Sequence, residues 1–178
     1  LLPLSYVFNG MLAPLLPFVL AGIAIDIFWQ TPIVSIWMIS RVTATALMWR
    51  LGSDLNIGGW HGRWSVLWGA LLAMGAGFVC TLCANALPML ILGLILFGGG
   101  MGVTYYAALY YAMAVGQAEV DAAGKHEAFI GSGYMVGPLI GLASLQTASS
   151  SFAPIIYAVL LLIFLAILVL AAFWRKAR

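Results

Sequence analysis

The last apolar stretch of the chain, residues 154–174, reads PIIYAVLLLIFLAILVLAAFW and is followed by Arg175, Lys176 and Arg178. It contains no charged residue over a length close to the roughly 20 apolar residues that cross the hydrocarbon core of a bilayer. Basic residues directly after such a stretch are typical of the cytoplasmic end of a transmembrane helix. This stretch therefore predicts a membrane protein.

The composition of the whole chain has the same character. Of its 178 residues, 65% are apolar and 7% are charged, seven Lys/Arg and five Asp/Glu. Because a soluble domain usually carries about a quarter charged residues, this composition excludes soluble globular, disordered and nucleic-acid-binding proteins. Six spans of about 20 residues would use most of the chain and leave short connections.

Polar breaks divide the sequence into six apolar runs, so we expect an all-α membrane protein whose six-helix transmembrane domain takes up residues 1–178. The first run ends at Asp26 and a Gln30–Thr31–Pro32 turn, and a polar connection over 117–125 precedes the fifth. Leu1 is not Met and lies inside an apolar run, so we expect a fragment of a longer protein. The expected helices are 4–25, 33–51, 64–83, 89–115, 127–146 and 154–174.

The basic residues at the helix ends and in the connections fall on one side of the membrane. Arg50 and Arg63 flank the connection between the second and third helices, Lys125 lies between the fourth and fifth, and the basic tail follows the sixth. The connections on the other side contain no Lys or Arg and one acid, Asp26. The positive-inside rule therefore predicts that both ends of this segment lie in the cytoplasm. We expect an integral protein of the plasma (inner) membrane.

Arg41 is the one charged residue near the middle of an expected helix. An Arg at this depth costs about 2.5–3.5 kcal/mol on insertion scales and commonly marks a transport pathway. Trp37 and Thr45 lie four residues to either side, on the same helical face. We predict that these three residues contact a substrate; the alternative is a structural Arg bonded to carbonyl groups of a neighbouring helix.

Further polar side chains fall on the fourth and first helices. Tyr105, Tyr106 and Tyr110 have hydroxyls that need partners in hydrocarbon, so they form either an aromatic wall of a substrate site or bonds to neighbouring helices. Asn9 is a candidate for either role. Pro14 interrupts the first helix, which is tolerated where a helix lines a cavity or changes shape.

The fifth helix carries three glycines at every fourth position, Gly133, Gly137 and Gly141, which we call the glycine stripe. Tandem small residues at this spacing permit close approach of another helix. Pro138 lies within the stripe and should bend the helix, because proline removes a backbone hydrogen bond. We expect tight packing and a hinge at the same place.

The residues predict no enzyme, no metal site and no cofactor. Cys80 and Cys83 form a CxxC at the end of an apolar run without further cysteines, so we interpret them as buried apolar residues. Ser132 lies between two glycines, as in an intramembrane serine protease, but such a site needs a His at membrane depth. The two histidines, His61 and His126, fall in or beside loops.

The six spans with both ends in the cytoplasm resemble one half of a major facilitator superfamily transporter. Gly62 and Arg63 are similar to the end of the family's cytoplasmic loop motif, although Gly59 stands where the motif has an Asp. The glycine stripe with Pro138 resembles the family's Gly–Pro motif, which is associated with antiporters. The incomplete loop motif and the basic tail favour the C-terminal half.

The resemblance implies secondary transport by alternating access between two six-helix halves. The expected partners are the lipid bilayer, a small-molecule substrate and the other half of the same protein, which would face the glycine stripe and supply any proton-coupling carboxylate. Efflux of drugs or metabolites coupled to protons is the first expectation, and a permease for uptake of a small anionic metabolite, suggested by Arg41, is the alternative. A non-transporting six-helix membrane protein and a channel are the other hypotheses.

Overall fold

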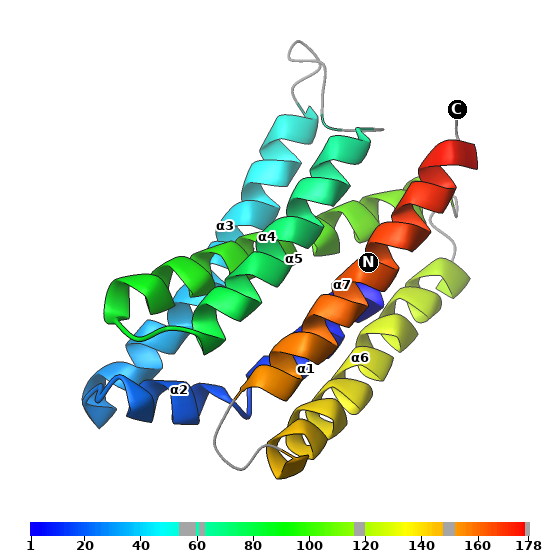
Figure 1. Cartoon of the computed structure of the whole chain (residues 1–178). Helices are drawn as coiled ribbons and strands as arrows, with labels where there is room; N and C mark the ends of the chain where they lie inside the picture. Colours follow the sequence, from blue (N-terminus) through cyan, green and yellow to red (C-terminus); the bar gives the residue numbers. More distant parts are fainter. Residues whose placement is uncertain (54–59, 61–62, 116–119, 148–151, 177–178) are drawn as a thin grey trace.

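The computed structural model describes residues 1–53, 60, 63–115, 120–147 and 152–176, and every regular element within these ranges is an α-helix (Figure 1). Four of these helices, α3, α4, α5 and α7, are long and apolar enough to cross a membrane, and α1 with α2 adds a fifth if the bent pair is one span. The prediction of an all-helical chain compatible with a membrane is confirmed for these residues. The helices are α1 (Leu2–Leu12), α2 (Leu16–Gly22), α3 (Ile27–Ser53), α4 (Trp64–Leu82), α5 (Leu87–Val115), α6 (Val120–Thr147) and α7 (Ala153–Lys176).

The first apolar run is not one continuous helix. α1 and α2 meet at an angle of 49°, and Pro14 lies in the break between them. Proline has no N–H and its ring collides with the carbonyl four residues earlier, so a helix cannot continue through it without bending. The turn is closed by the Leu15 amide, which donates to the Leu12 carbonyl at 2.9 Å.

The expected turn at Gln30–Thr31–Pro32 is wrong, because α3 begins at Ile27 and runs through these residues. Asp26 caps this helix: its Oδ1 accepts a hydrogen bond of 2.8 Å from the Phe28 amide. Gln30 also ties the helix start to the preceding segment, since its Nε2 donates to the Ile25 carbonyl at 3.1 Å. Pro32 falls near the start of α3, where it removes one helical hydrogen bond without ending the helix.

The expected polar connection before the fifth helix is also shorter than predicted. Residues 120–125 belong to α6, which begins at Val120. Asp121 and Lys125 face each other one turn apart and form an ion pair on the helix surface. Polar residues that suggested a loop are therefore the exposed first turns of a helix.

The glycine stripe of α6 packs against α1 of the same chain. A Cβ on Gly137 would lie 2.5 Å from the Val7 carbonyl oxygen and 2.8 Å from the Gly10 Cα, and Gly133 and Gly141 lie against Tyr6 and Met11. The expectation that the stripe faces a helix outside this chain is therefore wrong. The reason is that Gly10 of α1 provides the complementary small residue, so that the two backbones come close.

A second close pair is formed by α3 and α5. Gly98 of α5 faces the Trp37 carbonyl, and Gly102 faces the Arg41 carbonyl and Ala44 of α3. On its other side α5 packs against α4, where Gly77 and Gly93 allow close approach. The core between α1, α4 and α5 is apolar and contains the rings of Phe8, Phe78 and Phe97, one from each helix.

Candidate functional site

Arg41 of α3 is half-buried, and its side chain reaches residues of α1 and α5. Its Nη2 donates a hydrogen bond of 2.6 Å to the hydroxyl of Tyr6. Its Cζ lies 5.4 Å from the centroid of the Tyr6 ring and 5.2 Å from that of Tyr105. A guanidinium at these distances is attracted by the aromatic rings. Among the described residues, the hydrogen-bond partner of Arg41 is therefore a tyrosine on α1 and not a backbone carbonyl.

The contacts of Tyr6 extend this arrangement to α6. The ring of Tyr134 packs edge-on against that of Tyr6 with centroids 5.1 Å apart, and Asn9 Nδ2 donates to the Tyr134 hydroxyl at 3.4 Å. Five polar or aromatic side chains from α1, α3, α5 and α6 thus meet, and we call them the Arg41 cluster: Tyr6, Asn9, Arg41, Tyr105 and Tyr134. The four helices are those that carry the candidate site residues of the sequence.

Tyr6 and Tyr134 were not among the residues predicted from the sequence. Tyr134 directly follows Gly133, whose contact with Tyr6 Cβ brings the two rings together. A helix that packs through a glycine places the neighbouring side chains at the edge of the interface. Of these two tyrosines, Tyr134 could therefore have been predicted from the sequence, because it lies next to the glycine stripe.

Arg41 also borders a cavity of about 560 Å³ between α3 and α5. Thr45, Tyr105 and Tyr106 line it as well, as does Val42. The Thr45 hydroxyl donates to the Arg41 carbonyl at 2.9 Å, within its own helix. The described residues that line this cavity include no acid, so Arg41 is its source of charge.

Trp37 is not in the Arg41 cavity, although it shares a helical face with Arg41. It lines a neighbouring cavity of about 580 Å³ between α1, α2 and α3, together with Asn9 and Gln30. Met38 lines both cavities. The predicted stripe is thus divided between two adjacent hollows on one side of α3.

The predicted tyrosine wall is also divided. Tyr106 and Tyr110 pack around Trp60, with ring centroids 5.8 and 5.3 Å from the Trp60 ring. Trp60 is held there by its Nε1, which donates to the Met48 carbonyl at 2.9 Å. Tyr105 therefore belongs to the Arg41 cluster, Tyr106 reaches both places, and Tyr110 lies with Trp60 at the end of α5.

The remaining candidate residues lie in the packing surfaces or near the loop. Pro138 lies within α6, and its ring packs against Gly10 of α1. Arg63 precedes α4 with an extended backbone, and Gly62 lies outside the described residues. The described residues hold no group of three or more His, Cys, Asp or Glu side chains able to bind a metal.

Two sequence interpretations need correction. Cys80 is half-buried and Cys83 is exposed, because Cys83 follows the last turn of α4. His126 was expected beside a loop, but it belongs to α6 and its side chain is buried. Its ring centroid lies 5.6 Å from that of Tyr105. The longer α6 explains the second difference, since it carries His126 into the bundle.

Comparison of the chain with protein-family models, with curated proteins and with solved structures finds no match.

Proposed function

We propose that the chain is a six-helix module of a secondary active transporter, which moves a small molecule across the membrane by alternating access. The observation that carries this proposal is the Arg41 cluster, whose side chains come from four helices. Its cation, Arg41, lies on a helix that is compatible with a membrane and borders a cavity. Ionisable residues at membrane depth are costly and generally mark substrate or ion pathways. An inert bundle has no need of such a residue.

The order of helix packing supports the proposal. If α1 with α2 counts as one span, five spans among the described residues have the length and hydropathy to cross a membrane. We take the less apolar α6 as a sixth, so that the module consists of two sets of three spans. The first span of each set then packs through glycine against the second span of the other: α1 against α6, and α5 against α3. Inverted repeats of three helices within each six-helix half are a feature of major facilitator transporters.

In this proposal α6 is the fifth span, and both ends of the segment lie in the cytoplasm. Arg50, Arg63, Lys125 and the basic tail would then lie on one face of the plasma (inner) membrane. The exposed apolar side chains of α3, α6 and α7 would contact lipid or a second six-helix half of the same protein. The break at Pro14 and the glycine contacts of α1 with α6 would let the helices move relative to each other.

The surroundings of Arg41 favour a small anion with an aromatic or apolar body. A guanidinium has five N–H donors, and the hydrogen bond to Tyr6 uses one. A carboxylate accepts two parallel bonds from such a group, while the rings of Tyr105 and Tyr106 would contact the apolar body. Proton-coupled efflux of drug-like compounds, suggested by the Gly–Pro motif, is the competing substrate class.

Transport by the full-length protein in proteoliposomes tests the proposal, with radiolabelled benzoate as the anionic probe and Hoechst 33342 as the drug-like one. We expect transport of benzoate, with an initial rate lowered at least about tenfold in Arg41→Ala, which corresponds to about 1.4 kcal/mol. Thr43→Ala, an exposed position on the same helix, is the matched control and should leave the rate unchanged. Equal rates in Arg41→Ala and the unaltered protein would remove Arg41 from the site.

The competing function is a non-transporting six-helix membrane protein. It is favoured by the Arg41–Tyr6 hydrogen bond, which satisfies the guanidinium in part within the chain. The two functions differ in what the reading frame beyond this segment encodes. A transporter of this type requires about six further spans, and a reading frame without them would favour the non-transporting protein.

A further inference from the structure

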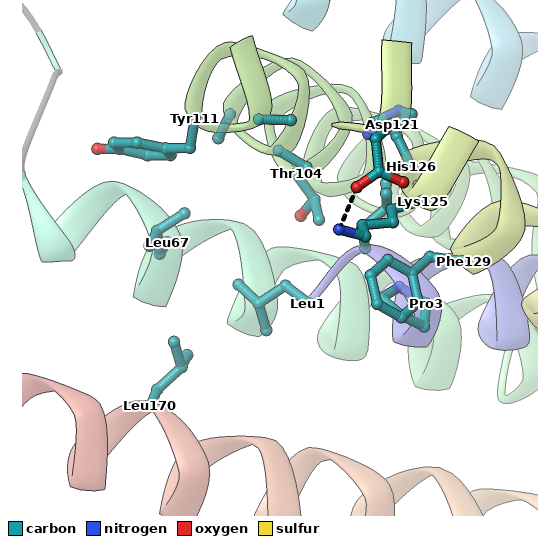
Figure 2. Close-up of a pocket in the computed structure, with 14 residues that line it drawn as sticks. Leu1, Pro3, Leu67, Thr104, Tyr111, Asp121, Lys125, His126, Phe129 and Leu170 are labelled. Carbon is teal, nitrogen blue, oxygen red and sulfur yellow. Dashed lines mark hydrogen bonds and ion pairs between the residues drawn. The ribbon is translucent and has the colours of Figure 1, made fainter. Parts of the chain in front are cut away.

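A third cavity, of about 620 Å³, lies among α1, α4, α5, α6 and α7 (Figure 2). We call it the His126 cavity. It shares no lining residue with the cavity beside Arg41. Apolar side chains such as Leu67, Phe129 and Leu170 form most of its wall. Its volume is in the range of pockets that bind small molecules.

Two buried polar atoms of this wall have no hydrogen-bond partner among the described residues: Thr104 Oγ1 and His126 Nε2. Thr104 is 2% exposed and His126 is 6% exposed, so bulk solvent does not satisfy them. A buried donor or acceptor without a partner destabilises a protein, and native structures contain few of them. Two such atoms on adjacent helices around one cavity indicate that something else bonds to them.

Thr104 differs from the other buried or half-buried Ser and Thr residues of the helices, whose hydroxyls donate to backbone carbonyls. Thr45, Thr81 and Ser144 each donate to the backbone carbonyl four residues earlier in their own helix. This local bond is the usual way for a hydroxyl to be satisfied inside a helix. Figure 2 shows the Thr104 hydroxyl turned instead toward the open space that Leu1 and Leu67 border.

The side-chain charges around the cavity cancel. Asp121 and Lys125 line it, and they are exposed and paired with each other. The Tyr105 ring packs against His126, and Tyr111 and Phe129 are the aromatic residues of the cavity wall. A wall whose side chains carry no net charge favours an uncharged ligand, because a charge in it would lose its hydration without gaining a free counter-charge among these side chains.

We infer that the His126 cavity binds an uncharged molecule with an apolar body and a hydroxyl group, which is held by Thr104 and His126. A hydroxyl both donates and accepts a hydrogen bond, as Thr does, and a neutral His Nε2 offers one bond of either kind. The same chemistry is found in a membrane lipid such as diacylglycerol and in a free phenol or alcohol. This site is distinct from the one proposed at Arg41.

Photolabelling of the full-length protein in lipid nanodiscs tests the inference. The probe is a decanol that carries a diazirine, and its methyl ether serves as the matched probe without a donor. We expect saturable labelling of peptides that contain residues 104–112 and 121–129, at least about fivefold weaker with the ether, as the loss of one hydrogen bond predicts. Equal labelling by the two probes would overturn the inference, and so would labelling that does not saturate.

Three variants separate the hydroxyl of Thr104 from its packing. Thr104→Val should lower the saturable labelling by about fivefold, and Thr104→Ser, which keeps the hydroxyl, should retain it. Thr81→Val is the control, since Thr81 is a buried threonine of α4 that does not line the cavity. Loss of labelling in both Thr104 variants, or the same loss in Thr81→Val, would contradict a role of the hydroxyl.

Competition identifies the source of the ligand. Displacement of the probe by diacylglycerol in the nanodisc supports a lipid, and displacement by 1-naphthol alone supports a free phenol or alcohol. Failure of both to displace the probe would contradict recognition of the hydroxyl group. Because neither measurement depends on transport, this result is independent of the outcome at Arg41.

Discussion

The Arg41 cluster and the His126 cavity both lie where α1, α5 and α6 meet, but they treat polar groups in opposite ways. In the Arg41 cluster, Arg41 bonds to Tyr6, and Asn9 bonds to Tyr134. In the His126 cavity, Thr104 and His126 each leave a buried atom without a partner among the described residues. The bundle can therefore satisfy polar groups within itself, and the unsatisfied pair marks a place for a ligand.

Disrupting the α1–α6 contact should have the largest effect, because this contact brings Tyr134 to Tyr6. In Gly137→Ala the new Cβ would lie 2.5 Å from the Val7 carbonyl oxygen, a backbone atom that cannot move aside. We expect the free energy of unfolding to fall by about 2–3 kcal/mol, measured by denaturant titration in detergent. Gly131→Ala on the same helix is the control, because its Cβ meets nothing within 4 Å and alanine favours the helix. Equal losses in the two variants would show that the contact is not tight.

Within the cluster, Tyr6 should matter more than Tyr134. Tyr6→Phe keeps the ring and removes a charge-assisted hydrogen bond of 2.6 Å, so we expect a loss of about 1–2 kcal/mol in the free energy of unfolding. Tyr134→Phe removes a bond of 3.4 Å from a more exposed side chain and should cost less than about 0.5 kcal/mol. The reverse order would mean that Arg41 has another principal partner.

In the His126 cavity we expect a substitution to raise the free energy of unfolding instead of lowering it. Thr104→Val removes an unpartnered hydroxyl, so we expect the ligand-free protein to gain about 1 kcal/mol in its free energy of unfolding. Thr81→Val, which breaks a bond of 2.8 Å to the Gly77 carbonyl, should instead lose about 1 kcal/mol. Delipidated protein compared by calorimetry gives both values. Destabilisation by Thr104→Val would place a protein partner on that hydroxyl.

The smallest effect is expected at the rim of the same cavity. Asp121 and Lys125 are both exposed, so their pair is weakened by solvent. Lys125→Ala should change the free energy of unfolding by less than about 0.5 kcal/mol, and the difference should shrink further when salt is added. A larger change that persists in high salt would show that the pair is part of the binding site.

The sequence predicted the helical class and several helix limits, because these depend on local composition. Charge-free runs mark α4, α5 and α7 directly, and basic residues also flank the runs of α4 and α7. Pro14 and Pro32 show that local sequence alone does not predict whether a proline ends a helix. Pro14 separates two helices, whereas Pro32 lies within α3, where the Asp26 cap and the Gln30 contact support the helix start.

The site was predicted only in part, for a similar reason. Arg41 stands out in any apolar run, but its partners depend on which helices pack together. Tyr6 is one of seven tyrosines in the chain, and only the folded bundle brings it within reach of the Arg41 side chain. His126 was misplaced because its polar neighbours suggested a loop, although they form the outer face of α6.

Cysteine accessibility beside Arg41 tests alternating access most directly, because it needs no known substrate. In the full-length protein with Cys80 and Cys83 replaced by serine, Val42→Cys places a thiol at a position that borders the Arg41 cavity and is 63% exposed. Leu161→Cys on α7 is the matched control, since Leu161 is similarly exposed, at 59%. We expect a membrane-impermeant thiosulfonate to label Val42→Cys in both right-side-out and inside-out vesicles and Leu161→Cys in neither. Labelling of Val42→Cys from neither side would contradict transport through the Arg41 cavity.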